Sequence, residues 1–543
     1  MTGSRTAFDR GDALERLGTE QFDVLVIGGG ITGAGVALEA ASRGLRTAVV
    51  EARDWANGTS SKSSKLVHGG LRYLQQKEYR LVYENLYERQ RLLENAPHLV
   101  APLPFLIPLF GKGGVVDKTV AKAYRSALWL YDLTGGVRIG RRHRRVSSEA
   151  ALAHMPTLRT DLLAAAFLYW DAAADDARLT LAVVRTAVVE HGAVAANYAP
   201  VAAITHDGDG NAAGAVLADG TEVRARAVVN ATGVWTDEVR ALDEATREGG
   251  LEPAKGVHLT VPRSKLPCDI AAVLPVRRDR RSVFVVPWGD FTYIGTTDTS
   301  YQGPLDDPQV EPDDVDYVLS AVNSWVTDPI DQADVTGSWA GLRPLVRGAS
   351  TARTADLSRR HAIHVSDRNL VTITGGKLTT YRHMAHDVLE ACRPILGQEV
   401  PKSRTKSLPL RGATGWEEAR EAEPHLAGRY GGEARTIRAM VDADPTLGEP
   451  LVPGLPYLRA EAVFAARYEM AHTLDDVLAR RTRALILRRD ASAEAAGEAA
   501  RLLAPELGWD ETEIARQVES FRARAERERV AAGLPRTTAP APS

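Results

Sequence analysis

The sequence is poor in cysteine: its 543 residues include only Cys268 and Cys392, and these form no C-x-x-C pair. This scarcity argues against a disulfide framework and a cysteine metal site, and it fits a reducing compartment. No run of about 18 uncharged apolar residues occurs, so we expect no membrane-spanning helix. The N-terminus has no apolar segment of the secretory type, so we expect no signal peptide.

The sequence also lacks a strong excess of positive or negative charge. The chain has 67 Lys and Arg against 70 Asp and Glu, a formal net charge of −3, which gives no electrostatic reason to expect a nucleic-acid partner. No metal-ligand spacing, Walker A loop or G-x-S-x-G turn occurs, so we expect no metal and no serine nucleophile. The composition, 44% hydrophobic and 25% charged, is that of a globular protein.

The most informative stretch, Gln21–Glu51, alternates strand and helix patterns around a glycine-rich turn. Asp23–Ile27 is a Val- and Leu-rich run typical of a buried parallel strand. It leads into Gly28–Gly33, whose letters GGGITG match G-x-G-x-x-G. Small residues predict a helix after the turn, and Leu45–Val50 predicts a second strand. This order is that of a dinucleotide-binding unit.

Each position of the motif has a mechanical reason. Gly28 allows the tight turn, Gly30 lets a pyrophosphate approach the backbone, and Gly33 lets the helix pack closely on the strand. The helix N-terminus offers free N–H groups to phosphates. Glu51, at the end of the second strand, can accept a hydrogen bond from a ribose hydroxyl. The alternative is a glycine turn with a purely structural role.

Two glycine-containing segments follow this unit. Asn57–Ser64 is nearly all Gly, Ser, Thr and Lys. It is either a solvent loop or a continuation of the cofactor site through hydroxyls such as those of Ser60 and Ser64. His68–Tyr73 (HGGLRY) then places paired glycines before an Arg-Tyr pair. Such glycines permit close backbone approach to a ligand.

Two later strands also end in glycine turns. One follows two D-G hairpin turns and ends at Ala231-Thr232-Gly233. This pattern is similar to the second cofactor contact of two-dinucleotide flavoproteins, and it favours FAD over NAD. The other, Leu370–Ile373, passes through Gly375 and Gly376 into a helix start at Lys377, which is another anion-ready helix N-terminus.

Together these stretches resemble the FAD-dependent glycerol-3-phosphate dehydrogenases, a family of the D-amino-acid-oxidase-like flavoprotein superfamily. The resemblance runs from about Phe22 to about Arg483, and its motifs are GTSSKSSKLVHGGLRYL, KGVH, GTTD, GGKLTTYR and YEMAHTLDDVLARRTR. It implies FAD as cofactor, oxidation of sn-glycerol 3-phosphate to dihydroxyacetone phosphate, and a membrane quinone as electron acceptor. It also implies that the GGKLTTYR turn lies against the flavin.

The motifs and the resemblance together define the expected cofactor-binding residues. They are Gly28, Gly30, Gly33, Glu51, Ser60, Ser64, His68, Gly69, Thr232, Gly233, Gly376, Lys377, Leu378 and Thr379.

A phosphate-ester substrate is a dianion, and burying it requires several fixed cations. Four cations stand beside Gly, Pro or turn residues on the matching motifs: Arg72, Arg343, Arg359 and Lys377. Taken singly, each is more typical of a structural ion pair; taken together, they predict a substrate clamp. Arg343 or Lys377 is expected nearest the reacting carbon and the flavin. The sequence leaves open whether Arg359 or Arg360 meets the phosphate.

Oxidation of a secondary alcohol also needs a base. His68 and His258 are the candidates, because imidazole titrates nearest neutrality; either can instead be a structural histidine, and the functional role is favoured only for His258. Tyr73 is placed to orient the phosphate or the hydroxyl. The expected catalytic residues are therefore Arg72, Tyr73, His258, Arg343, Arg359 and Lys377.

Three other functions stay open at this point. An oxidase would hand the electrons to oxygen, and a regulator with a dead pocket would bind FAD without being reduced. An amino-acid-oxidase-like enzyme would need one carboxylate-pairing arginine rather than four cations.

The order of patterns predicts an α/β and α+β fold. We expect a Rossmann-like FAD-binding domain built from separated segments, an antiparallel-sheet substrate region and a helical C-terminal domain. A stretch with three prolines, Ala101–Phe110, is expected to be irregular or an edge strand. The expected boundaries are 20–110, 160–250 and 335–400 for the FAD-binding domain, 111–159 and 251–334 for the substrate region, 405–531 for the helical domain and 532–543 for a disordered tail.

A lipid-soluble quinone has to reach the flavin, so we expect a cytoplasmic protein bound peripherally to the inner face of the cell membrane. The candidate contact is Lys112–Arg145, where basic residues flank Leu128–Tyr131 and Arg141–Arg145 add a second basic cluster. The alternative is that Leu128–Tyr131 pack into the core and the arginines are only solvated. The oligomeric state stays open, with a homodimer among the options.

Replacing Gly30 with Val should give a colourless protein, because the branched side chain would occupy the place expected for the pyrophosphate. The measurement is the flavin absorbance of the purified protein, with the yellow parent chain as reference. A Gly30→Val variant with full FAD content would contradict the assignment of this turn.

Overall fold

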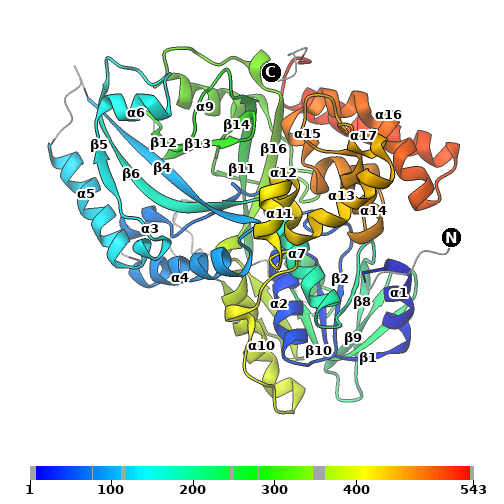
Figure 1. The fold of residues 1–543 in the computed structure, drawn as a ribbon. Coiled ribbons are helices and arrows are strands. Elements are labelled where there is room, and N and C mark those ends of the chain that lie inside the picture. Colours follow the sequence, from blue (N-terminus) through cyan, green and yellow to red (C-terminus); the bar gives the residue numbers. More distant parts are fainter. Residues whose placement is uncertain are drawn as a thin grey trace.

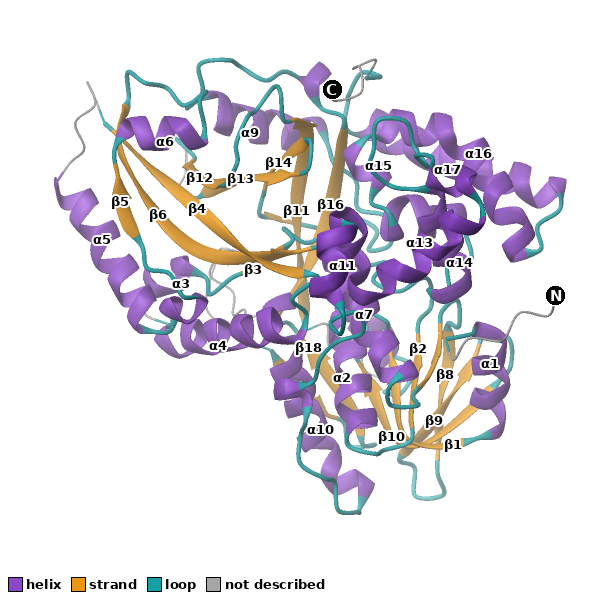
Figure 2. Cartoon of the chain, viewed as in Figure 1, coloured by secondary structure: helices purple, strands orange, loops and turns teal. Residues whose placement is uncertain are grey.

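The computed structural model describes residues 8–75, 78–111, 118–244, 250–277, 281–346 and 361–537. The described part of the molecule consists of two sheets, helices that pack on them, and a set of C-terminal helices (Figures 1 and 2). The first sheet has the order β17-β18-β10-β1-β2-β7, with β9 beside β10 and β8 beside β9. Its strands are β1 (Gln21–Ile27), β2 (Thr47–Val50), β7 (Val194–Ala196), β8 (Val201–His206), β9 (Ala212–Leu217), β10 (Glu222–Asn230), β17 (Ala362–Val365) and β18 (Leu370–Thr374).

Strand β1 lies inside this sheet and pairs in parallel with β2 and β10. Because side chains alternate along a strand, its two faces bury different residues. Val24 and Val26 pack into a core that includes residues of α2 (Ile31–Ser42), α7 (Asp176–Val189) and α10 (Tyr381–Leu396), whereas Leu25 and Ile27 face α1 (Arg10–Thr19) and the β8–β9 hairpin. Burial on both faces explains the uninterrupted apolar run of β1.

The second sheet is formed by strands from residues 66 to 346. Its order is β15-β11-β14-β13-β12-β4-β6-β3, with β16 beside β11 and β5 beside β6. The strands are β3 (Leu66–Val67), β4 (Val100–Phe110), β5 (Arg144–Val146), β6 (Leu163–Ala174), β11 (Leu251–Pro262), β12 (Ala271–Pro275), β13 (Ser282–Trp288), β14 (Phe291–Gly295), β15 (Thr299–Ser300) and β16 (Gly337–Val346).

Strand β4 corrects the expectation of an irregular or edge segment, because it lies between β6 and β12. Its prolines, Pro102, Pro104 and Pro108, all stand at even positions. Their missing N–H groups therefore face one edge of the strand. Strand β6 pairs along the whole length of β4, whereas β12 pairs only at Phe105 and Leu106. The proline spacing is thus compatible with a central strand that needs a full ladder on one side only.

The expected domain boundaries differ from these sheets in one respect. Strands β3, β4, β6 and β16 fall within segments assigned to the FAD-binding domain, yet they belong to the second sheet. The remaining helices outside the C-terminal set are α3 (Leu71–Gln75), α4 (Tyr79–Asn95), α5 (Lys118–Leu133), α6 (Ser148–His154), α8 (Thr236–Arg240) and α9 (Pro312–Asn323). Among the described residues, no helix combines the length and apolar character needed to cross a membrane.

The C-terminal helices, yellow to red in Figure 1, lie beside β16 and α7. They are α11 (Trp416–Ala422), α12 (Pro424–Tyr430), α13 (Ala434–Ala443), α14 (Arg459–Tyr468), a π-helical turn (Asp476–Arg481), α15 (Ala484–Leu487), α16 (Arg489–Leu507) and α17 (Glu511–Ala531). The expected disorder after Ala531 is wrong for residues 532–537: Ala532 and Leu534 are buried, and the Thr537 N–H donates to Asp490. Residues 538–543 lie outside the described part.

Buried ion pairs join these helices to the loop after β2. The carboxylate of Asp54 accepts hydrogen bonds from Arg480 at 2.6 Å and from Arg481 at 2.7 and 2.8 Å. Asp176 is likewise paired with Lys65 at 3.1 Å and with Arg483 at 3.0 Å. All of these side chains are at most 5% exposed. In so dry a setting, the loop and the C-terminal helices depend on each other for charge compensation.

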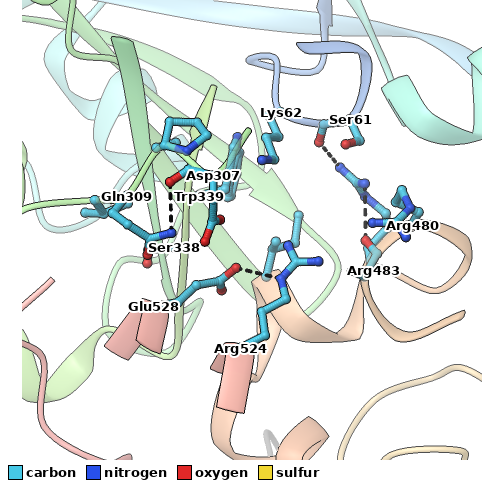
Figure 3. Close-up of a pocket in the computed structure, with 15 residues that line it drawn as sticks. Ser61, Lys62, Asp307, Gln309, Ser338, Trp339, Arg480, Arg483, Arg524 and Glu528 are labelled. Carbon is cyan, nitrogen blue, oxygen red and sulfur yellow. Dashed lines mark hydrogen bonds and ion pairs between the residues drawn. The ribbon is translucent and has the colours of Figure 1, made fainter. Parts of the chain in front are cut away.

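A small cavity of about 30 Å³ lies in this seam. Figure 3 shows Lys62 directed into it, the Arg524–Glu528 ion pair below, and the bond from Arg483 to the Ser61 carbonyl oxygen at the side. Burial and the nearby Arg524 guanidinium lower the pKa of Lys62 to about 8. The seam is therefore polar and cationic rather than an apolar domain interface.

Replacing Arg481 with Ala should destabilise the protein strongly. The change removes two hydrogen bonds from a buried carboxylate, and breaking such a pair costs about 3–5 kcal/mol. Scanning calorimetry should show a lower thermal midpoint, and limited proteolysis should cut the C-terminal helices earlier. Arg438→Ala is the matched control. Arg438 forms ion pairs with Glu423 and Asp442 at the surface, and such pairs contribute little to stability. Equal midpoints for the two variants would refute the role given to the seam.

Candidate active site

The glycine-rich turn between β1 and α2 is closely packed. Gly28 has φ of +113°, and a Cβ there would lie 2.7 Å from the Ala231 carbonyl oxygen. A Cβ on Gly33 would lie 1.8 Å from the Gly28 carbonyl oxygen. Gly30 is the N-cap of α2, and the first helical N–H, of Ile31, donates to Ser60 Oγ at 2.9 Å. These contacts leave no space for a side chain at Gly28 or Gly33.

Glu51 closes the same turn from the end of β2. Its carboxylate accepts hydrogen bonds from the N–H groups of Gly29 at 2.6 Å and Arg53 at 2.9 Å. Burial raises the pKa of Glu51, and the two hydrogen bonds oppose that shift. The carboxylate lies at the cavity wall, where an acid can bind ribose hydroxyls.

A cavity of about 510 Å³ runs along the ends of the first sheet. Its wall combines helix N-terminal N–H groups, a buried acid and glycine turns, which suit a dinucleotide of the FAD type. Nine of the fourteen expected cofactor-binding residues line it: Gly28, Gly30, Glu51, Ser60, Thr232, Gly233, Gly376, Lys377 and Leu378.

The other five do not line the cavity. Gly33 packs on the turn itself, and Ser64 Oγ is 2.9 Å from His258 Nε2. The N–H of His68 donates to Thr379 Oγ1 at 3.3 Å. Gly69 is hydrogen-bonded to the buried side chains of Tyr131, Asp171 and Asn85. The structure therefore gives these residues supporting positions around the cavity.

His258, on β11, is 2% exposed and stacks on Trp339 with ring centroids 4.7 Å apart and an interplanar angle of 8°. Burial, together with the positive charges of Lys65 and Arg343, lowers the pKa of His258 well below its usual range. The imidazole is therefore neutral near pH 7. Its Nε2 meets Ser64, and its Nδ1 has no hydrogen-bond partner within the described ranges.

Of the four expected cations, the structure describes the side chains of Arg343 and Lys377, and only Lys377 lines the cavity. Arg343 is held by Asp298 Oδ1 at 3.0 Å and by Thr296 Oγ1 at 3.0 Å. Lys377 lines the cavity with its Nζ 4.0 Å from the centroid of the Tyr73 ring. Arg72 belongs to α3, but its side chain is outside the described part, as is the whole of Arg359.

Sequence reasoning missed the contact that closes the cavity at Asp306. Arg53 Nη2 lies 2.7 Å from Asp306 Oδ2, and Trp235 Nε1 donates to Asp306 Oδ1 at 2.9 Å. All three residues line the cavity. They come from loops about 70 to 250 residues apart along the chain, and no local pattern marks them. The stacking of Trp339 on His258 was missed for the same reason.

Comparison with known proteins identifies the family. A family model described as FAD dependent oxidoreductase matches residues 23–382. The chain belongs to the FAD-dependent oxidoreductase family. A second model, described as the C-terminal domain of alpha-glycerophosphate oxidase, matches residues 403–514 of this oxidoreductase. FAD is its cofactor, as expected from the sequence.

Individual relatives agree with this assignment. The oxidoreductase is 43% identical to Glycerol-3-phosphate dehydrogenase 2 of Mycobacterium tuberculosis over 540 residues, which cover 96% of this chain and 90% of the relative. It is 36% identical to the human mitochondrial glycerol-3-phosphate dehydrogenase, covering 93% of this chain and 73% of the relative. The resemblance noted in the sequence is thereby confirmed.

Structural comparison supports the fold. A solved glycerol-3-phosphate dehydrogenase from Bacillus halodurans, complexed with FAD, matches with a TM-score of 0.75 and 31% identity. The match covers 96% of this chain and 97% of that one. The expected α/β and α+β fold, with a Rossmann-like FAD-binding part and C-terminal helices, is confirmed.

Gly33→Ala should abolish FAD binding by this oxidoreductase, because the added Cβ would lie 1.8 Å from a backbone oxygen. The measurement is the ratio of FAD to protein in the purified variant. Gly428→Ala is the control, since a Cβ at that helical glycine meets nothing within 4 Å. Stoichiometric FAD in the Gly33 variant would contradict the requirement for glycine at this position.

Proposed function

We propose that this oxidoreductase oxidises sn-glycerol 3-phosphate to dihydroxyacetone phosphate and passes the electrons to a membrane quinone. The observation that carries the proposal is the similarity over 96% of the chain to proteins named glycerol-3-phosphate dehydrogenase. The matched regions include both the cofactor part and the C-terminal helices.

Removing two electrons from a secondary alcohol means moving a proton from the hydroxyl and a hydride from its carbon. When bound, FAD supplies the hydride acceptor. His258 is our candidate for the base, because it is neutral and bonded through Nε2 to Ser64. Lys377 would place a cation at the cavity wall, where charge develops on the substrate oxygen.

The phosphate group needs cations that keep their geometry when buried. Arg343 is our first candidate, because Asp298 and Thr296 fix its guanidinium by hydrogen bonds. Arg72 and Arg359 complete the proposed clamp, and Tyr73 orients the substrate beside Lys377. A cluster of this kind suits a phosphate dianion better than the single carboxylate of an amino acid.

The surface of α5 supports a peripheral membrane position on the inner face. Leu128 and Tyr131 are buried, so part of the apolar run packs into the core, as the alternative interpretation held. Trp129 and Leu133, however, are 43% and 77% exposed. Exposed basic side chains lie on the same helix and just after it: Lys122, Arg125, Arg141, Arg142, Arg144 and Arg145. Apolar and basic groups together suit an anionic lipid surface.

The decisive experiment is anaerobic addition of glycerol 3-phosphate to the purified holoenzyme while the flavin spectrum is recorded. Bleaching that a quinone analogue reverses, but air alone does not, is the expected result. Fast reoxidation by air would establish the oxidase alternative, which the C-terminal match to an alpha-glycerophosphate oxidase model favours. A flavin that glycerol 3-phosphate never bleaches would refute the proposal.

The clamp gives a graded prediction. Arg343→Ala or Arg359→Ala should weaken transition-state stabilisation by roughly 1.5–3 kcal/mol, the scale of a lost charge-assisted contact, and Lys377→Ala should slow flavin reduction most. Stopped-flow reduction rates and kcat/KM are the measurements. The exposed Lys402→Ala serves as control. Near-normal kinetics in all three variants would exclude the clamp.

Membrane binding has a separate test by flotation. Changing Arg141, Arg142, Arg144 and Arg145 together to Gln should reduce binding to anionic vesicles, because each basic group near the lipid contributes about 1 kcal/mol. Turnover with a soluble dye should stay unchanged. A parent protein that fails to float with such vesicles at low salt would rule out this membrane position.

A further inference from the structure

The backbone at Gly69 is held on both sides by buried side chains of three different elements. Its N–H donates to the hydroxyl of Tyr131 on α5 at 3.0 Å and to Asp171 Oδ1 on β6 at 3.1 Å. Its carbonyl oxygen accepts a hydrogen bond from Asn85 on α4 at 2.9 Å. The two peptide groups that flank Gly69 are thereby fixed in orientation, unlike loop peptides that face water.

The acceptor group in this cluster is itself fully engaged. Asp171 accepts hydrogen bonds from the Tyr131 hydroxyl at 2.7 Å and from Arg89 Nη1 at 2.6 Å. The Arg89 and Asp171 side chains are 0% and 2% exposed. Burial, together with the charge of Asp171, raises the pKa of Tyr131 well above its usual range, so its hydroxyl stays a donor. The Tyr131 hydroxyl thus donates to Asp171 while it accepts from Gly69.

Glycine is required for this close approach. A Cβ at Gly69 would lie 2.4 Å from both the Tyr131 hydroxyl and Leu86 Cδ2. The glycine therefore lets the peptide reach a site built for it inside the protein, and the sequence motif HGG serves this contact as well as any ligand. No step of the proposed reaction uses Tyr131, Asp171 or Arg89.

The held peptide connects directly to the cofactor wall. Its neighbour His68 donates an N–H hydrogen bond to Thr379 at 3.3 Å. Four residues further along, the Tyr73 ring lies 4.0 Å from Lys377 Nζ. Lys377 in turn lines the cofactor cavity. The segment His68–Tyr73 thus has one point fixed in the protein interior and two contacts on the turn that carries Lys377.

We propose that Tyr131 and Asp171 are positioning residues of this oxidoreductase. They fix the Gly69 peptide, which sets the segment His68–Tyr73 against the turn that carries Lys377. Since Lys377 acts on the substrate only if the function proposed above holds, the kinetic part of this inference rests on that function. The structural part, placement of the turn against the flavin, does not.

Tyr131→Phe in the holoenzyme tests the inference, because phenylalanine keeps the buried ring and loses only the hydroxyl. FAD content and thermal midpoint should stay near those of the parent. The visible circular dichroism of the bound flavin should change, because the wall beside it shifts. Anaerobic reduction by glycerol 3-phosphate should slow about tenfold, the scale of one or two lost buried hydrogen bonds.

Tyr169→Phe is the matched control. Tyr169 lies on β6 and, like Tyr131 on α5, is buried; the two ring centroids are 6.0 Å apart. It should leave spectrum and rate unchanged. A Tyr131→Phe enzyme with parental dichroism and parental reduction rate would overturn the inference. So would a variant that loses FAD or stability while each remaining flavin is reduced at the parental rate, since that result shows a structural role only.

A double variant tests the route through Lys377. Tyr131→Phe combined with Lys377→Ala should be slowed less than the product of the two single effects; exact multiplication would overturn this route. The dichroism readout keeps the inference separate from the proposed function. If glycerol 3-phosphate fails to bleach the parent flavin, the function falls, and the difference between Tyr131→Phe and Tyr169→Phe in dichroism still decides the positioning role.

Discussion

Two buried aspartates join the loop between β2 and β3 to the C-terminal helices. Asp54 is shared by Arg480 and Arg481, and Asp176 joins Lys65 to Arg483. The loop between β2 and β3 has little regular structure, and its backbone is held at points such as the Ala56 N–H on the Gly29 carbonyl oxygen and the Ala174 N–H on the Lys65 carbonyl oxygen. The buried charges add further anchors, because no water can replace their partners. The C-terminal helices are therefore part of the cofactor site without lining it.

The same loop links this constraint to the reaction site. Ser60 Oγ accepts the first helical N–H of α2, and Ser64 meets His258, so the loop is tied both to the cofactor-binding turn and to the candidate base. Lys65 lies over the Trp339 ring at 4.6 Å, and Trp339 stacks on His258. The charge of Lys65 is one of the causes that keep His258 neutral. Burial is the main cause of the lowered pKa of His258, and a lysine whose ion pair holds the fold adds to it.

The local parts of this arrangement were predictable from the sequence. Glycine spacing at Gly28–Gly33 and the acid at Glu51 reflect contacts within one βαβ unit, and strand periodicity reflects burial of β1. The position of β4 was not predictable, because the proline spacing has meaning only when its neighbours β6 and β12 are known. The contact of Asp306 with Arg53 joins two loops that lie far apart in the sequence. The Gly69 motif was found, whereas its partner Asp171 lies 102 residues away.

Helix α5 makes contacts on two opposite sides. Trp129 and Leu133 face outward, and Tyr131 between them reaches the Gly69 peptide in the interior. A label, antibody or fusion attached to the outer side would load the same helix that fixes an internal peptide. Probes on this surface therefore report on two things at once, and a neutral attachment point is better sought on the exposed face of α13, at Arg438 or Asp442.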